Sequence, residues 1–195
     1  MAFFRTINFS EPLPTIAGDG VTLRTPQMTD YADWAALREQ SRDFLVPWEP
    51  TWPGDDLTRS AFRRRIRRYA EDLRSDQGYA FLITRNSDDA VVGGLTLANV
   101  RRGVAQAGSL GYWMGVPFVR HGYMTAAVRT VIPFAFKTLR LHRLEAACIP
   151  TNVGSIRLLE KTGFVREGYA REYLCINGTW QDHLLYARMR DAAKS

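Results

Sequence analysis

The chain has 195 residues, of which 46% are hydrophobic and 24% are charged, and it contains two cysteines. These values are ordinary for one globular domain spanning residues 1–195, and they exclude a disordered chain, a coiled coil and a disulfide scaffold. We expect a cytoplasmic protein with no membrane contact, because no apolar run approaches the roughly 18 residues of a membrane span and the N-terminus lacks a secretory signal.

The net charge of +6 is unevenly distributed along the chain. No acidic residue lies between Asp89 and Glu145, although the chain has 20 acidic residues in all. Such an acid-free block favours binding of an anionic ligand, usually a phosphate group. A basic stretch without a ligand is the alternative, and charge alone does not decide between the two.

The N-terminal half predicts helices followed by strands. Prolines fix φ and disfavour helix before them, so Pro47, Pro50 and Pro53 predict a rigid, non-helical stretch. In chain order we expect an extended arm over 1–20, a strand over Val21–Thr25, a helix capped by Thr29 or Asp30 and ending near Asp43, a helix over Asp55–Asp76, and strands over Tyr79–Thr84, Ala90–Val100 and Ala105–Met114.

The C-terminal half predicts one β–α–β passage and a hairpin. Asn177–Gly178 is a strong signal for a two-residue hairpin turn. The expected elements are helices over Gly122–Thr138 and Asn152–Thr162, and strands over Arg143–Ile149, Phe164–Cys175 and Thr179–Arg188. Cys148 and Cys175 lie in the strand-like runs and are interpreted as small core residues. The fold class is therefore α/β or α+β with a mixed, largely antiparallel sheet.

The run VPFVRHGYMT, Val116–Thr125, joins a predicted strand to a predicted helix. A strand, a glycine and a helix N-terminus aim backbone N–H groups and the positive end of the helix dipole at a phosphate. Gly122 permits close approach of the backbone, and Arg120 and His121 add possible side-chain contacts. An ordinary turn with one glycine is the alternative, since neither dinucleotide nor P-loop spacing is present.

Two further segments carry candidate catalytic residues. In TNVGSIRLLEKTGF, Asn152 is an expected N-cap, and the Ser155 hydroxyl points out of the helix N-terminus, where it can protonate a leaving anion. In REYLCINGTWQDH, Glu172 is a candidate general base, although most such carboxylates are merely solvated. Asp182 and His183 are adjacent on a strand and point to opposite faces, so they form no catalytic pair. The histidines and cysteines show no metal-ligand spacing, and no metal is expected.

The predicted helix over 55–76 carries an arginine run, RRRIRR, at residues 63–68. Its apolar stripe accounts for folding, with buried positions expected at Phe62, Ile66, Tyr69 and Leu73. A solvated basic face is the favoured interpretation. Contact with RNA or with an acidic protein surface is the alternative.

Taken together, GYWMGVPFVRHGYMTAAV, TNVGSIRLLEKTGF and EGYAREYLCINGTWQDHLLYARM resemble the GNAT superfamily of acetyl-CoA-dependent N-acetyltransferases. The segment SRDFLVPWEP, Ser41–Pro50, is similar to the ribosomal-protein-alanine N-acetyltransferases within that superfamily. The resemblance covers about Gly20 to Met189 and implies a twisted sheet with splayed central parallel strands, flanked by helices.

The resemblance also implies roles by position. The pantetheine arm of acetyl-CoA would bind the backbone of Tyr112, Trp113 and Met114 and the side chain of Asn152. The pyrophosphate would bind the loop and helix start at Arg120, His121, Gly122, Tyr123, Met124 and Thr125. Val119 replaces the Gln or Arg of the family pattern. Ser155 would lie near the thioester sulfur, and Glu172 matches a family acid to within about two residues.

The implied reaction is direct attack of a neutral amine on the thioester, without metal or covalent enzyme intermediate. A protein α-amine has a pKa of about 7.7–8.0, so a sizeable minority of the amine groups is neutral near pH 7. The expected base, Glu172 acting through water, therefore needs to deprotonate an amine that is only weakly basic. The expected partner is a protein N-terminus, such as that of a ribosomal protein, with VPWEPTWP forming one wall of the cleft. A small-amine acetyltransferase and a non-catalytic ribosome- or RNA-binding relative remain as alternatives.

Overall fold

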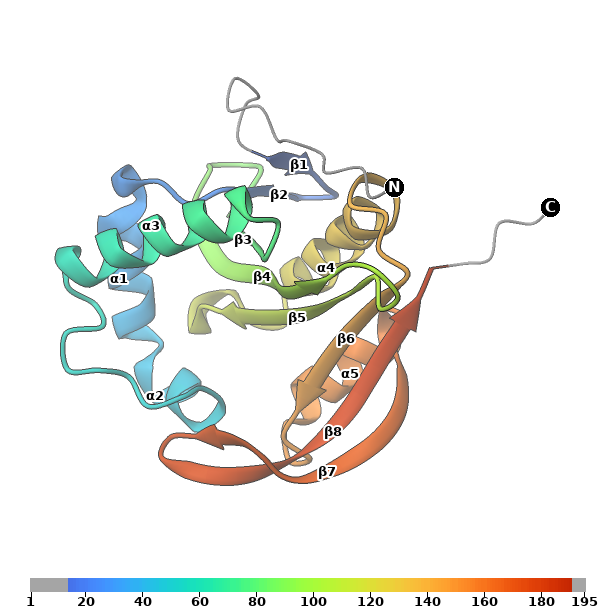
Figure 1. Cartoon of the computed structure of the whole chain (residues 1–195). Coiled ribbons are helices and arrows are strands. Elements are labelled where there is room, and N and C mark those ends of the chain that lie inside the picture. The colour runs from blue at the N-terminus through green and yellow to red at the C-terminus, as the bar shows by residue number, and fades with distance from the viewer. Residues whose placement is uncertain (1–13, 191–195) are drawn as a thin grey trace.

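A computed structural model describes residues 14–190 of the chain. Eight strands form one sheet in the order β1-β2-β3-β4-β5-β6-β8-β7 (Figure 1). The strands are β1 (Thr15–Ala17), β2 (Val21–Arg24), β3 (Tyr79–Arg85), β4 (Val91–Arg101), β5 (Ala107–Met114), β6 (Arg143–Cys148), β7 (Val165–Ile176) and β8 (Thr179–Met189). Only β5 and β6 are parallel, which confirms the expected mixed and mostly antiparallel sheet.

The described residues 14–190 contain five α-helices, which lie around the sheet. They are α1 (Tyr31–Gln40), α2 (Arg42–Leu45), α3 (Arg59–Arg74), α4 (Tyr123–Pro133) and α5 (Val153–Lys161). Helices α4 and α5 bury Val128, Val131 and Leu159 in the main core, against residues of the central strands. Helices α1 and α3 bury Trp34 and Phe62 in a second cluster on the other face. Alternation along the strands supplies both clusters, since neighbouring residues of a strand point to opposite faces.

Local chemistry sets several boundaries as the sequence predicts. The Asn152 side chain caps α5 by accepting a hydrogen bond from the Ser155 N–H at 3.0 Å. The β7–β8 hairpin turns at Asn177 and Gly178, which have φ of 45° and 79°, as a type I′ turn requires. Phe62 is buried in α3 at the start of the predicted stripe, with Ile66, Tyr69 and Leu73 half-buried below it.

The N-terminal third departs from the prediction in three places. Strand β1 lies within the predicted extended arm and pairs with β2, while residues 1–13 lie outside the described residues. The first helix ends at Gln40, because the chain turns at the buried Ser41 before α2. The stretch predicted as non-helical contains a 3-10 turn, Val46–Trp48, whose second residue is Pro47. A helical first turn needs no N–H at that position, so proline fits there.

Three other predictions need correction. Helix α3 begins at Arg59, four residues later than expected, because the Thr58 hydroxyl accepts the Ala61 N–H at 3.2 Å and caps it. The predicted helix over 122–138 changes at Pro133 into a π-helical turn, Phe134–Thr138. Cys175 is exposed, whereas Cys148 is buried. Cys175 lies near the tip of the edge strand β7, where β8 pairs with it but the core does not reach.

Candidate active site

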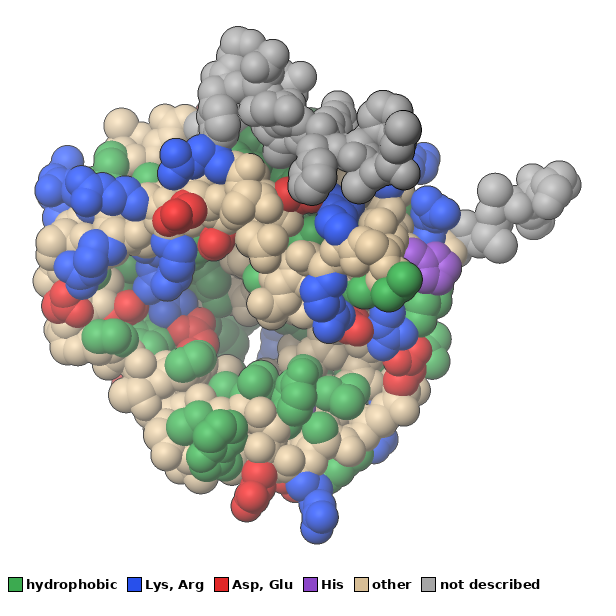
Figure 2. All heavy atoms as spheres, in the orientation of Figure 1, with side chains coloured by type: hydrophobic (Ala, Val, Ile, Leu, Met, Phe, Trp, Pro, Cys, Tyr) green, Lys and Arg blue, Asp and Glu red, His purple; other side chains and the backbone are tan. Residues whose placement is uncertain are grey.

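The parallel strands β5 and β6 separate after three residue pairs. Ala107–Ser109 pair with Arg143–Glu145, after which β5 continues beside β4 and β6 continues beside β8. The edge of β5 at Tyr112–Met114 therefore faces a gap rather than a strand. Figure 2 shows a hollow in the molecule at this place, below β5 and above the β7–β8 hairpin. The splay expected between these strands is present.

The loop after β5 is held close to α1. A Cβ on Gly115 would lie 2.4 Å from Cδ1 of Leu37, so only glycine permits this approach. The Ser41 hydroxyl accepts the Val116 N–H at 2.9 Å. These two contacts attach the loop to α1 and to Ser41, the residue that directly follows α1. The sequence pattern contains no signal for the link between Ser41 and Val116, because 75 residues separate them.

The start of α4 presents a row of free backbone donors. No side chain caps this helix, and the N–H groups of residues 122–125 have no hydrogen-bond acceptor within residues 14–190. Arg120 and Gly122 have φ of 64° and 85°, which turns the chain sharply before the helix. Consecutive N–H groups at a helix N-terminus form an anion site that favours phosphate. The acid-free block of the sequence surrounds this loop.

The side chains of this loop are less well placed to contact a ligand than its backbone N–H groups are. The His121 ring stacks on Tyr123 at 5.9 Å and 13°, and its Nδ1 lies 2.9 Å from the Val119 carbonyl oxygen. Tyr123 and Met124 pack partly against the main core, and Thr125 is half-buried. The backbone of the loop, rather than its side chains, forms the candidate phosphate site.

Ser155 and Tyr112 meet across the splay. The Ser155 Oγ lies 2.7 Å from the Tyr112 Oη, and burial raises the pKa of Tyr112 above its ordinary value. Tyr112 is therefore neutral at physiological pH, and either hydroxyl can be the donor in this hydrogen bond. Sequence reasoning assigned only the backbone of Tyr112 to the site, and no local signal identifies the partner of a hydroxyl 43 residues away.

Glu172 lies apart from this pair. It occupies an irregular part of the edge strand β7, between Ala170 and Leu174, and has φ of 45°. Its N–H donates to the Asp182 Oδ1 at 2.8 Å, while its exposed side chain has no hydrogen bond or ion pair within the part of the chain that is described. Tyr169 donates to the other oxygen of Asp182. The structure thus brings Asn152, Ser155 and Tyr112 together but leaves Glu172 in solvent.

A cleft of about 240 Å³ lies on the α1 and α3 side of the sheet. Its walls are mainly apolar and aromatic, and the charged residues that line it are Arg38, Glu49 and Arg65. Trp113, one residue after Tyr112, forms the part of the wall next to the splay. Of the segment VPWEPTWP, Glu49 and Pro50 line this cleft, whereas Trp48 and Trp52 are not among its lining residues.

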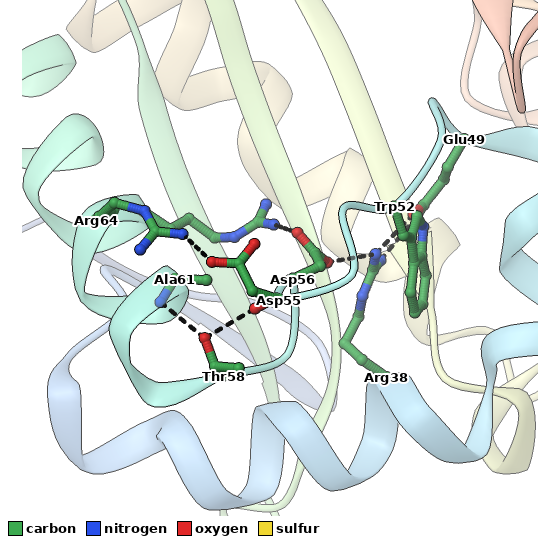
Figure 3. Close-up of polar contacts among 9 residues, drawn as sticks. Arg38, Glu49, Trp52, Asp55, Asp56, Thr58, Ala61 and Arg64 are labelled. Atoms are coloured by element: carbon green, nitrogen blue, oxygen red, sulfur yellow. Dashed lines mark hydrogen bonds and ion pairs between the residues drawn. The ribbon is translucent and has the colours of Figure 1, made fainter.

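Arg38 is the centre of a polar network beside this cleft (Figure 3). Its Nη1 and Nη2 donate to the two Glu49 carboxylate oxygens at 2.8 and 2.7 Å. The Trp52 Nε1 also donates to Glu49, at 2.8 Å, and the Arg38 guanidinium lies 4.0 Å from the Trp52 ring centre. Figure 3 also shows Asp56 on the other side of Arg38. The Asp56 Oδ1 accepts a hydrogen bond from Nη2 of Arg65 at 2.8 Å.

Among the described residues, no group of three or more His, Cys, Asp and Glu side chains is placed to hold a metal ion. Within the same residues, no helix is long and apolar enough to cross a membrane. The arginines of α3 are mostly exposed, and Figure 2 shows basic side chains gathered over this helix.

Comparison with known proteins gives consistent matches. Residues 21–165 match the family described as the acetyltransferase (GNAT) domain. A probable N-acetyltransferase of Bacillus subtilis, YjcK, is 38% identical over 172 residues, covering 88% of this chain and 95% of the relative. The [ribosomal protein uS5]-alanine N-acetyltransferase of Escherichia coli is 31% identical over 176 residues, covering 90% of this chain and 91% of the relative.

Solved structures agree with these matches. The ribosomal-protein-S5-alanine acetyltransferase of Vibrio fischeri superposes with a TM-score of 0.85 at 30% identity, covering 93% of this chain and all of that one. Mycobacterium smegmatis RimJ, in complex with a CoA-disulfide, also gives 0.85, at 29% identity over 94% of this chain and 89% of the other.

Proposed function

Since this chain belongs to the GNAT acetyltransferase family and is an N-acetyltransferase that uses acetyl-CoA, we propose that it acetylates the N-terminal α-amine of a protein, such as a ribosomal protein. The observation that carries the catalytic part is the Ser155–Tyr112 hydroxyl pair at the splay, beside the free N–H row of α4. The relatives named as ribosomal-protein-alanine acetyltransferases support the substrate class.

The geometry suits two parts of coenzyme A, the charged pyrophosphate and the polar pantetheine arm. The N–H groups from Arg120 to Thr125 would hold the pyrophosphate, with Gly122 at the turn. The pantetheine arm would lie along the free edge of β5 at Tyr112–Met114, as an added partner in the gap. Asn152 would flank this arm through the part of its amide that the helix cap leaves free.

Acetyl-CoA supplies the thioester whose acetyl group is transferred. Ser155 would donate a proton to the departing thiolate, and Tyr112 would replace that proton through their 2.7 Å hydrogen bond. Tyr112 would then regain a proton from water, which receives the proton that the amine loses. Burial favours the neutral form of Tyr112, so the Tyr112 and Ser155 hydroxyls are both protonated over the whole physiological pH range. Tyr112 is thus added to the candidate residues that the sequence identifies.

The incoming amine needs limited help. A protein α-amine with pKa about 7.7–8.0 is partly neutral near pH 7, whereas a lysine amine near 10.4 is almost wholly charged. We propose that Glu172 removes the proton through water, in keeping with its solvated position on β7. A remote, solvated base suffices for an α-amine but not for lysine.

The cleft next to Trp113 supports an acceptor that enters end-first. Its volume of about 240 Å³ is below the roughly 300–1,000 Å³ of pockets that enclose drug-sized ligands. This space admits the first residues of a chain, and its aromatic walls suit a small apolar side chain. The rest of a protein substrate would lie outside, over the surface of α3 or the β7–β8 hairpin.

Thiol release from acetyl-CoA, measured with a panel of amines, tests this function. The panel contains peptides starting with alanine or serine, the same peptides with blocked N-termini, and polyamines and free amino acids. We expect release only with free N-terminal peptides. Release with a small amine alone would favour a small-molecule acetyltransferase, and release with no member of the panel would favour a non-catalytic binding protein.

A further inference from the structure

Glu49 is the only acidic side chain among the described residues that line the cleft. Its side chain is 21% exposed and forms part of the cleft wall. The other charged groups there, Arg38 and Arg65, are cations that repel an ammonium group. A protonated N-terminus entering the cleft therefore has one carboxylate to meet.

In the structure the Glu49 carboxylate already has hydrogen-bond donors. Both of its oxygens accept hydrogen bonds from Arg38, and one also accepts from Trp52. Arg38 itself is only 5% exposed, and its guanidinium lies 4.0 Å from the ring centre of Trp52 and 5.0 Å from that of Trp113. An ammonium group can bind Glu49 strongly only when Arg38 has another partner, because a buried guanidinium without a carboxylate is costly.

A second partner for Arg38 is present. Asp56 is 8% exposed, and its Oδ2 is buried without a hydrogen-bond partner among the described residues. That oxygen lies 4.0 Å from Nη2 of Arg38, the atom that now donates to Glu49. Hydrogen bonds form at about 2.7–3.2 Å, so a movement of roughly 1 Å would complete this bond. The free oxygen also carries a desolvation penalty that the new bond would remove.

We propose that Glu49 is the residue that recognises the charged amine of the acceptor, and that Asp56 takes over Arg38 when the amine arrives. This inference rests on the proposed function and deepens it by assigning the group that selects an N-terminus. Cation–π attraction extends to about 6 Å, so a shift of roughly 1 Å keeps the guanidinium in contact with Trp52 and Trp113. Glu49 is a recognition residue here, and the proton transfers described above do not depend on it.

The position of Glu49 also suits this role. Its carbonyl oxygen accepts the N–H of Asn177 at 2.9 Å, so the tip of the β7–β8 hairpin closes on the same residue. Trp113 lines the same cleft and directly follows Tyr112 on β5. An amine bound at Glu49 would therefore enter between the hairpin and α1 and lie on the path to the splay.

The test uses two ligands that differ only at the N-terminus. One is an uncharged hexapeptide that begins with a free alanine, and the other is the same peptide with an acetylated N-terminus. Calorimetry on the protein with saturating coenzyme A gives the affinity for each. We expect the wild type to bind the free peptide roughly tenfold more tightly or better, the effect of one hydrogen bond to a charged group.

Glu49→Gln removes the charge and keeps the shape of the side chain. We expect the affinity ratio to fall to about one, because the free peptide alone loses binding. Asp56→Asn is expected to lower the ratio as well, since Arg38 then stays on Glu49. Asp55→Asn is the matched control: Asp55 is a neighbouring, half-exposed carboxylate paired with Arg64 at 2.5 Å outside the cleft lining, and the ratio should be unchanged.

The outcomes separate the proposals. If Glu49→Gln weakens both peptides equally, or leaves the ratio intact, Glu49 has a structural role and the inference is wrong. An unchanged ratio in Asp56→Asn overturns the exchange of Arg38, and this variant serves even where Glu49→Gln does not fold. A wild type that binds both peptides equally refutes the inference alone, whereas one that binds neither refutes the proposed function with it.

Discussion

Replacing Ser155 by alanine separates the helix cap from the hydroxyl. The cap bond runs from the Ser155 N–H to the Asn152 side chain, so Ser155→Ala keeps it and removes only the bond to Tyr112. Loss of one neutral hydrogen bond costs about 0.5–1.5 kcal/mol, and the higher helix propensity of alanine offsets up to about 0.5 kcal/mol of it. We expect a small decrease in stability, of a few degrees in Tm at most.

The effect on turnover should be much larger. General acid catalysis contributes about 10²–10⁴-fold, and we expect the low end because a thiolate is a tolerable leaving group. A loss of about 100-fold in kcat corresponds to about 2.7 kcal/mol in the barrier, more than the expected loss of stability. KM for acetyl-CoA should change little, because the contact strengthens only as the thiolate forms.

The assay is steady-state thiol release with a free N-terminal peptide, at a temperature where all variants are folded. Asn152→Ala is the control for the cap and should cost about 1 kcal/mol of stability. Tyr112→Phe should lower kcat as Ser155→Ala does, and the double variant should be no slower than the slower single one. Wild-type kcat in Ser155→Ala would refute the assignment and leave the proton to water or to Tyr112 alone.

Four further predictions follow from other parts of the molecule. Gly122→Glu should weaken coenzyme A binding at least tenfold by calorimetry, since it adds a Cβ at a φ of 85° and a negative charge beside the phosphates; unchanged affinity would exclude this loop. Replacing Arg64 and Arg68 by Gln should change stability by no more than about 0.5 kcal/mol per site and leave peptide turnover intact, whereas a loss confined to a whole ribosomal substrate would identify a docking face. Glu172→Gln should reduce the rate mainly on the acid side of the pH profile, where less amine is neutral, and an unchanged profile would remove it as the base. The Tyr169 hydroxyl and the Glu172 N–H donate to Asp182 and lower the pKa of its carboxyl from 3.8. The ionised Asp182 carboxylate therefore stabilises the fold above pH 4, and this stabilisation is lost as the pH falls through the lowered pKa. The Tm difference between wild type and Asp182→Asn should accordingly vanish in acid.

The features predicted from sequence are those with a local cause. The cap at Asn152 and the turn at Asn177–Gly178 each depend on a few consecutive residues, and both are present. The strand–glycine–helix order at Gly122 is also present, since Gly122 lies between β5 and the first residue of α4. The splay of β5 from β6 came from the resemblance and not from the pattern of residues.

The features missed depend on contacts between distant segments. Tyr112 meets Ser155 only because β5 and α5 converge at the splay, and neither neighbourhood in sequence signals the pair. The exposure of Cys175 follows from the edge position of β7, which alternation along a strand cannot reveal. The pairing of Arg38 with Glu49 joins two elements across a chain reversal, so the sequence shows two ordinary charges.

The position of the transferred acetyl group tests the central claim most directly. The substrate is a peptide that begins with alanine and carries one internal lysine, incubated with the enzyme and acetyl-CoA and then fragmented in a tandem mass spectrometer. The account predicts an acetyl group on the N-terminal α-amine and none on the lysine, because the site offers only a weak base for an amine near pKa 10.4. Acetylation of the lysine side chain, or no acetylation of the peptide where a polyamine is acetylated, would contradict it.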